Sequence, residues 1–204
     1  MREGRAIIDF AARITRLATM TKTDILAPLR FFYGAAGRDL PVKFLPPAGL
    51  PEQARYLLVH DGDMTSRLAG FHGSAITLDA HGSSLMGNEL FRASVLRRAD
   101  TTAPVEFGAI EIALAGFEGE PLRRILKAEG PLGGILVEFA IPFSSHPSGF
   151  FSITVDGVLA NLLGVPLGAT LYGRCNTLRH EDGTVLAEVV EILPGETRQD
   201  LLSP

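Results

Sequence analysis

The sequence predicts an α+β fold, with an antiparallel β-sheet and helices grouped on one side of it. Two observations support this class. Several strand-like segments follow one another through short turns, and the helical segments are grouped between them instead of alternating with single strands. The chain has 204 residues, of which 46% are hydrophobic, and this is enough for one compact domain with a substantial core.

The strongest strand signal is the C-terminal stretch 168–194. It predicts two long strands folded about a turn at 181–183, because Asp-Gly between strand-like runs favours a tight turn. Glu188 and Glu191 lie on the second, otherwise apolar strand. A buried lone charge is costly, so each carboxylate must face water or have a cationic partner. A carboxylate held in that way is a candidate catalytic acid or base.

The rest of the chain yields further elements. Alternating patterns and turn residues predict strands over 74–80, 89–98, 105–113 and 150–155. Apolar residues at helical spacing, with capping and helix-ending residues, predict helices up to about residue 21 and over 23–32, 52–60, 63–71, 121–129 and 157–163, and a helical segment from residue 131 that leads into 139–142.

Residues 34–51 contain several Gly and Pro and are expected to form a connecting loop. We therefore assign residues 1–50 to N-terminal helices and a loop that serve packing or an oligomer contact, and residues 51–204 to the main part of a single compact domain. The sequence does not set the oligomeric state.

Composition excludes several classes of function. The chain has 23 acidic and 19 basic residues, a net charge of −4, and no block of Lys or Arg, so a nucleic-acid partner is not expected. Cys175 is the one cysteine, which leaves no disulfide framework and no cysteine-based metal site. The apolar runs are too short for a bilayer, and the N-terminus predicts an amphipathic helix, not a signal peptide. We expect a cytoplasmic protein with no membrane partner.

Four segments, taken together, resemble the chorismate pyruvate-lyase family. They are an acidic-x-Met-Thr helix start, an arginine-bearing strand, a Pro-Leu-Gly turn and a Tyr-Gly-Arg segment followed by a glutamate-bearing final strand. In this chain they lie at 63–68, 91–96, 130–133 and 172–174 with 191–194. Their order and spacing cover about two-thirds of the chain and carry the resemblance, since no single motif is specific.

The resemblance implies a chorismate lyase-like fold and a cofactor-independent lyase that converts chorismate, or a similar acid, to 4-hydroxybenzoate and pyruvate. It implies a small anionic aromatic-precursor substrate and no metal. The same fold occurs in the UTRA ligand-binding domains of GntR-type regulators, so the alternative is a non-catalytic small-molecule-binding protein of the UTRA type.

Arg92 is the implied anchor for a substrate carboxylate, because a guanidinium presents a planar pair of donors that matches a carboxylate. The plainer alternative is a strand arginine that is exposed or paired with Glu106 or Glu89. A further alternative is a lyase-like enzyme with a changed reaction, because an acidic Glu106 near the pocket would disfavour a dianionic substrate.

Glu191 is the implied proton donor or acceptor at the ether oxygen. In the family's final strand, the spacing from the turn to the glutamate matches Glu191 in this chain. The spacing from the glutamate to the following proline, counted back from Pro194, matches Val190 instead, which cannot transfer a proton. Glu188 competes for the role. Because positions 188 and 191 differ by three, they point to opposite faces of a regular strand, and only one of them can share a pocket unless a bulge intervenes.

Three other residues complete the implied site. Met64 and Leu132 match positions that line the family's pocket, although taken alone each is an ordinary packing residue. Arg174 is either a second contact for the anion or the ion-pair partner of Glu188 or Glu191. The glycines at 130, 133 and 134 either allow a helical flap to cover a ligand or simply separate two short helices.

Overall fold

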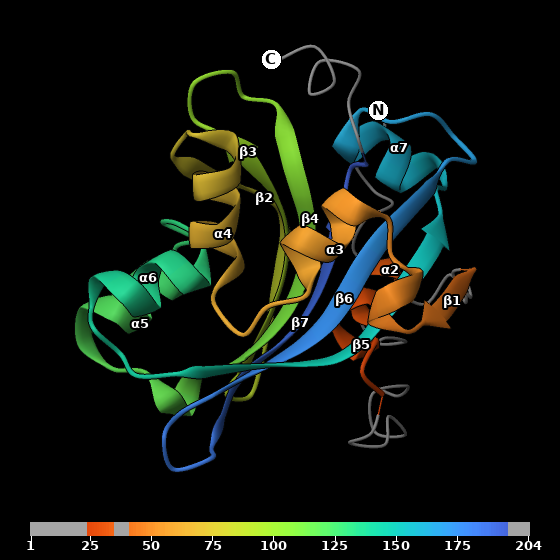
Figure 1. Ribbon diagram of the computed structural model, residues 1–204. Helices are drawn as coiled ribbons and strands as arrows, with labels where there is room; N and C mark the ends of the chain where they lie inside the picture. The colour runs from red at the N-terminus through yellow and green to blue at the C-terminus, as the bar shows by residue number, and fades with distance from the viewer. Residues whose placement is uncertain (1–23, 35–40, 196–204) are drawn as a thin grey trace, which may run out of the picture.

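The structure, a computed structural model, describes residues 24–34 and 41–195 (Figure 1). Within these residues, seven strands form one antiparallel sheet in the order β1-β5-β6-β7-β4-β3-β2. The predicted α+β class with an antiparallel sheet is confirmed. The strands are β1 (Val42–Leu45), β2 (Ile76–Met86), β3 (Glu89–Arg98), β4 (Pro104–Ala113), β5 (Ser144–Thr154), β6 (Thr170–Arg179) and β7 (Val185–Leu193).

Helices cover both faces of this sheet. The helices are α2 (Ala27–Tyr33), α3 (Glu52–Leu58), α4 (Met64–His72), α5 (Gly119–Leu126), α6 (Leu132–Glu138) and α7 (Gly157–Leu163), with 3₁₀ turns at Pro47–Gly49 and Leu114–Gly116. Helices α3 to α6 are grouped on one face, as expected, while α2 and α7 pack on the other (Figure 1). We call these the α4–α6 face and the α2/α7 face.

The central strands are buried on both faces, so their side chains divide between two cores. On the α2/α7 face, Val95, Phe107 and Val190 pack with residues of α2 and α7. On the α4–α6 face, Ile110 and Val189 pack against α5 and α6. Polar side chains between these apolar residues therefore become buried as well.

Three segments of the sheet differ from the sequence prediction. Strand β2 continues to Met86, beyond the predicted end at residue 80. Strand β1 lies in the stretch 34–51, which was expected to be a loop, and pairs with β5 at the edge of the sheet. Strand β5 starts at Ser144, ahead of the predicted start at 150, and its pairing with β6 shifts register between Pro147 and Gly149. Strands 89–98 and 105–113 and the final hairpin are confirmed within one or two residues.

Local signals explain the helix ends. The Asp63 side chain accepts a hydrogen bond from Ser66 N at 2.8 Å and caps α4. Asp156 caps α7 in the same way, and Gly164, with φ of 67°, ends it. Helix α5 ends at Leu126, earlier than predicted, so Gly130 is not its C-terminal glycine. The helix expected before residue 21 lies outside the described residues.

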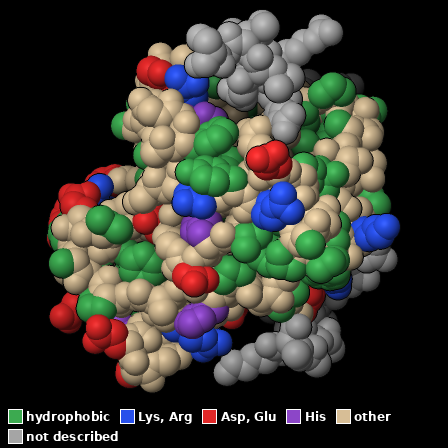
Figure 2. Space-filling model, in the orientation of Figure 1, with side chains coloured by type: hydrophobic (Ala, Val, Ile, Leu, Met, Phe, Trp, Pro, Cys, Tyr) green, Lys and Arg blue, Asp and Glu red, His purple; other side chains and the backbone are tan. Residues whose placement is uncertain are grey.

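The surface seen in Figure 2 mixes acidic and basic side chains, and on this face the Lys and Arg side chains are dispersed among other residues. Over the described ranges, no helix has both the length and the apolar character needed to cross a membrane.

Candidate functional site

A cavity of about 60 Å³ lies between the α4–α6 face of the sheet and the N-terminal ends of α4 and α6. Four residues that the sequence singles out, Arg92, Glu191, Met64 and Leu132, line this one cavity. The other lining residues are Asp63, Thr65, Leu78, Ser94, Leu96, Glu106, Gly108, Ile110, Pro131, Gly133, Asn176, Leu178 and Val189.

The strand register explains how distant residues reach the same cavity. Glu191 of β7 lies opposite Gly108 of β4 on one side and opposite Arg174 of β6 on the other. Gly108 in turn lies opposite Ser94 of β3. Arg92 lies two residues before Ser94 and therefore projects from the same face. Arg92 and Glu191 thus come from neighbouring rows of side chains on the α4–α6 face.

Arg92 is a buried cation with little compensation. The residue is 4% exposed, and its Nη1 donates to the Ile125 carbonyl at a long 3.5 Å. Its Nε has no hydrogen-bond partner among the described residues, and none of the ion pairs found there includes Arg92. Burial lowers the pKa of Arg92 to about 10, so it remains charged at neutral pH. Neither Glu89 nor Glu106 pairs with it.

Arg174 forms a buried ion pair with Glu191. Their side chains are 0% and 7% exposed. Arg174 Nη1 also donates to the carbonyls of Leu58 and His60, at 3.0 and 3.1 Å, and these contacts hold the end of α3 against the sheet. Of the alternatives open for Arg174, the structure shows the ion pair with Glu191, and Arg174 is not among the residues that line the cavity.

Glu188 is not brought to the cavity. It lies opposite Glu111 and Thr177 in the sheet, on the α2/α7 face, because its position differs from that of Glu191 by an odd number. Its carboxylate accepts a hydrogen bond from Thr177 Oγ1 at 2.9 Å, and burial raises its pKa. Val190 also lies on the α2/α7 face, in the apolar core.

The N-terminal ends of α4 and α6 form the roof of the cavity. Met64 and Leu132 contribute apolar side chains to it, and both are buried. The two helices meet at Gly133, where a Cβ atom would lie 2.9 Å from Asp63 Oδ1. A glycine is therefore required at 133 for this close approach. Gly130, in contrast, lies in the loop before α6 with a positive φ of 133° and is not among the lining residues.

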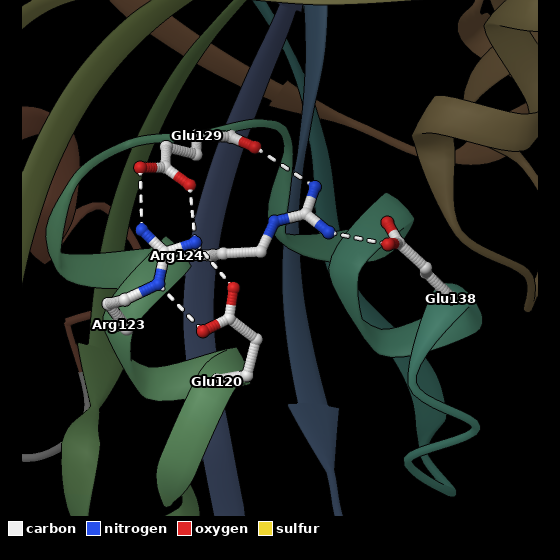
Figure 3. Close-up of polar contacts among 5 residues, drawn as sticks. All are labelled: Glu120, Arg123, Arg124, Glu129 and Glu138. Atoms are coloured by element: carbon white, nitrogen blue, oxygen red, sulfur yellow. Dashed lines mark hydrogen bonds and ion pairs between the residues drawn. The ribbon is translucent and has the colours of Figure 1, made fainter.

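Ion pairs on the surface connect α5 with α6 and with the loop between them (Figure 3). Arg124 of α5 donates to Glu138 of α6 at 2.6 Å and to the Glu129 carbonyl at 3.1 Å. Arg123 binds both Glu120 and the Glu129 carboxylate. Single exposed pairs contribute little, but here several of them form one network that spans the α5–α6 connection.

Some residues of the site carry no signal in the sequence. Asn176 lines the cavity, and its Nδ2 donates to Ser145 Oγ at 3.0 Å, which fixes the amide. His60 contacts Arg174, because its backbone carbonyl accepts a hydrogen bond from Arg174 Nη1. Burial, and then the Arg174 charge, lower the pKa of His60 to about 4, so this ring is neutral at pH 7. Neither role follows from spacing, because both depend on contacts between distant strands and helices.

A metal site is not formed by the residues that the structure describes, since no three His, Cys, Asp or Glu side chains gather there. Cys175 is buried in the α2/α7 core, and burial raises its pKa to about 12.

No protein-family model and no curated protein sequence matches this chain. Solved structures do match its fold. The effector domain of PhnF from Mycobacterium smegmatis superposes with a TM-score of 0.53 at 16% identity, over 66% of this chain and 89% of that domain. PhnF itself gives 0.53 at 15% identity, over 67% of this chain, and the match spans 65% of the PhnF chain.

A third structure, gene product SA0254 from Staphylococcus aureus, superposes with a TM-score of 0.50 at 8% identity, over 65% of this chain and 87% of that one. At these identities the matches show the fold alone. The chain therefore has the chorismate lyase-like fold that is shared with UTRA effector domains.

Proposed function

We propose that this domain binds a small organic acid in the cavity between the sheet, α4 and α6, with Arg92 as the anchor for the carboxylate. The observation that carries this proposal is the uncompensated charge of Arg92, which is 4% exposed and lines the cavity with an unpartnered Nε. A buried cation without a counter-charge is costly in an empty domain. A ligand carboxylate would supply both the charge and the missing hydrogen bonds.

Arg92 is the one basic residue among those that line the cavity, so it is the group there that can bind a carboxylate. Glu191 is neutralised by its ion pair with Arg174 and does not compensate Arg92. The rest of the lining is mostly apolar, with Met64, Leu132 and Ile110 among its members. A small pocket with an apolar wall and a few placed polar groups is typical of ligand-binding sites. The fold match to the effector domain of PhnF agrees with a binding role.

A chorismate pyruvate-lyase activity is the second candidate, because Arg92, Glu191, Met64 and Leu132 line the same cavity. Two observations favour binding over catalysis. Glu191 is engaged by Arg174, so proton transfer at this carboxyl would have to break a buried ion pair. The cavity of about 60 Å³ is also small for a ring that carries two carboxylates and an enolpyruvyl ether.

Titration calorimetry with a series of short carboxylic acids tests the binding proposal. We expect saturable binding by the wild-type domain, and a loss of about 10- to 150-fold in affinity in Arg92→Gln, since a charge-assisted hydrogen bond contributes about 1.5–3 kcal/mol. Arg55→Gln, which changes an exposed arginine of α3, is the matched control. Equal affinities in wild type and Arg92→Gln would contradict the proposal.

The lyase candidate has its own test. The protein is incubated with chorismate, and 4-hydroxybenzoate and pyruvate are quantified. If the wild-type protein makes both products, and Arg92→Gln and Glu191→Gln make neither, the protein is a lyase and not only a binding domain.

A further inference from the structure

Glu106 is a second buried ionisable residue of the cavity, separate from the Arg174–Glu191 pair. It lies on β4 opposite Leu96 and is 3% exposed. Its carboxyl lies over Gly108, because a Cβ atom added at 108 would be 3.2 Å from Glu106 Oε1. Because Gly108 has no side chain, it leaves the space that this carboxyl occupies. Gly108 lies opposite Glu191 in the sheet.

Glu106 and Arg92 face the same cavity without pairing. Glu106 Oε2 and Arg92 Nε are both buried atoms without a hydrogen-bond partner in the described part of the chain. Their positions on the strands separate the two residues. Arg92 lies opposite Ile110, four residues along β4 from Glu106, which is roughly 13 Å of strand.

Burial disfavours the charged form of Glu106 when the cavity is empty. Burial, and then the Glu191 carboxylate, raise the pKa of Glu106 well above its ordinary value, and the Arg174 charge opposes this only in part. Asp63 and Arg92 are the other charged groups that line the cavity. A neutral carboxyl donates and accepts hydrogen bonds, and an ionised one accepts from a cation.

We infer that the cavity is built for a two-ended ligand, a short carboxylic acid whose other end carries a hydrogen-bond donor, either hydroxyl or ammonium. This inference rests on the proposed function. The carboxylate pairs with Arg92, and the donor satisfies Glu106 Oε2. A volume of about 60 Å³ has room for only a few non-hydrogen atoms, since roughly 10–15 Å³ of such volume holds one water.

The unpartnered carboxyl also supplies selectivity. An acid without the donor would neutralise Arg92 but leave Glu106 buried and unsatisfied, which costs about 1–3 kcal/mol. A site that is built to hydrogen-bond a ligand group rejects analogues that lack it, because its own polar atoms are then left unpaired.

Matched acids test this inference by calorimetry at neutral pH. The probes are propionate, 3-hydroxypropionate and β-alanine, together with butyrate, 4-hydroxybutyrate and γ-aminobutyrate. At one chain length or both, we expect the hydroxy or the amino acid to bind about 5- to 150-fold more tightly than the unsubstituted acid. Propionate and butyrate that bind as tightly as their substituted partners would overturn the inference, while the carboxylate site itself would stand.

Variants at position 106 show whether the ligand's donor contacts Glu106, and whether this donor is a hydroxyl or an ammonium group. Glu106→Leu should abolish the preference for substituted acids. Glu106→Gln keeps an acceptor but not the charge, so it should retain a preference for hydroxy acids and lose a preference for amino acids. Glu188→Gln, on the opposite face, is the control and should leave the preference unchanged. Because Glu106→Gln is close in shape, it keeps the test valid if Glu106→Leu does not fold.

A preference that persists in Glu106→Leu would also overturn the inference. If none of the six acids binds the wild-type domain, the proposed carboxylate site fails, and this inference fails with it.

Discussion

Arg174 and Glu191 lie directly opposite each other on β6 and β7 and form an ion pair that is almost completely buried. The pair is built into the sheet under the cavity, and Arg174 extends it to the carbonyls of Leu58 and His60 at the end of α3. It therefore serves two purposes, because it neutralises one carboxylate at the cavity and joins a helix to the sheet.

Arg174→Met should be strongly destabilising, because it leaves Glu191 buried without a counter-charge. We expect a loss of about 3–5 kcal/mol in the free energy of unfolding, measured with urea. The double variant Arg174→Met/Glu191→Leu should recover a large part of this loss, since it leaves no buried charge. A double variant that is no more stable than Arg174→Met would show that the contacts with the α3 carbonyls, and not the charge, are decisive.

Arg92→Met should behave in the opposite way. Arg92 has no counter-charge in the empty cavity, so its replacement by an apolar side chain should leave the ligand-free domain at least as stable as wild type, by urea denaturation. Carboxylate binding should be lost in the same variant. A clear destabilisation of the ligand-free domain would mean that Arg92 has a structural role.

Two adjacent glycines of α6 test the contact between the roof helices. In Gly134→Ala, the new Cβ would have its nearest contact at 4.0 Å, so helix propensity should raise stability by about 0.5–1 kcal/mol. In Gly133→Ala, the new Cβ would lie 2.9 Å from Asp63 Oδ1 and should cost about 1–3 kcal/mol. The comparison is made by thermal unfolding of the two variants, and equal gains in both would contradict the close approach of α4 and α6.

Glu106 should make stability fall as pH rises. Above about pH 4.5, the folded protein retains a proton on Glu106 that the unfolded chain has released, because its folded-state pKa is raised. Each pH unit then costs up to about 1.4 kcal/mol until the folded-state pKa is reached. Glu106→Gln removes this contribution, so its stability relative to wild type should increase between about pH 5 and pH 8.

Glu111 and Glu188, whose pKa values burial also raises, are present in both proteins and therefore cancel in this comparison. A constant difference in the free energy of unfolding across that pH range would show that Glu106 is already ionised in the folded state.

Much of the fold follows from local patterns. The hairpin around 181–183, the helix capped by Asp63 and the strand 89–98 depend on turn chemistry, capping and alternation, which act over a few residues. Strand β1 could not be predicted, because it lies in a Gly- and Pro-rich stretch and forms only by pairing with β5 at the sheet edge. Pro147 obscured the first half of β5, since proline fits a strand only at a bulge or an edge.

The candidate site shows a similar division. The resemblance to the chorismate pyruvate-lyase family predicts Arg92, Glu191, Met64 and Leu132 as site residues, and the structure places all four around one cavity. The odd spacing of Glu188 and Glu191 correctly indicates opposite faces. The partner of Arg174 could not be chosen from the sequence, because it depends on the register between β6 and β7.

The most direct test of the central claim is the ¹H–¹⁵N resonance of Arg92 Nε during titration with 3-hydroxypropionate, assigned by its absence in Arg92→Lys. This signal should shift and saturate together with the calorimetric binding curve, because the unpartnered Nε–H acquires a carboxylate acceptor. An acid that binds while the Arg92 Nε signal stays unchanged would contradict the central claim, since the carboxylate would then be held elsewhere.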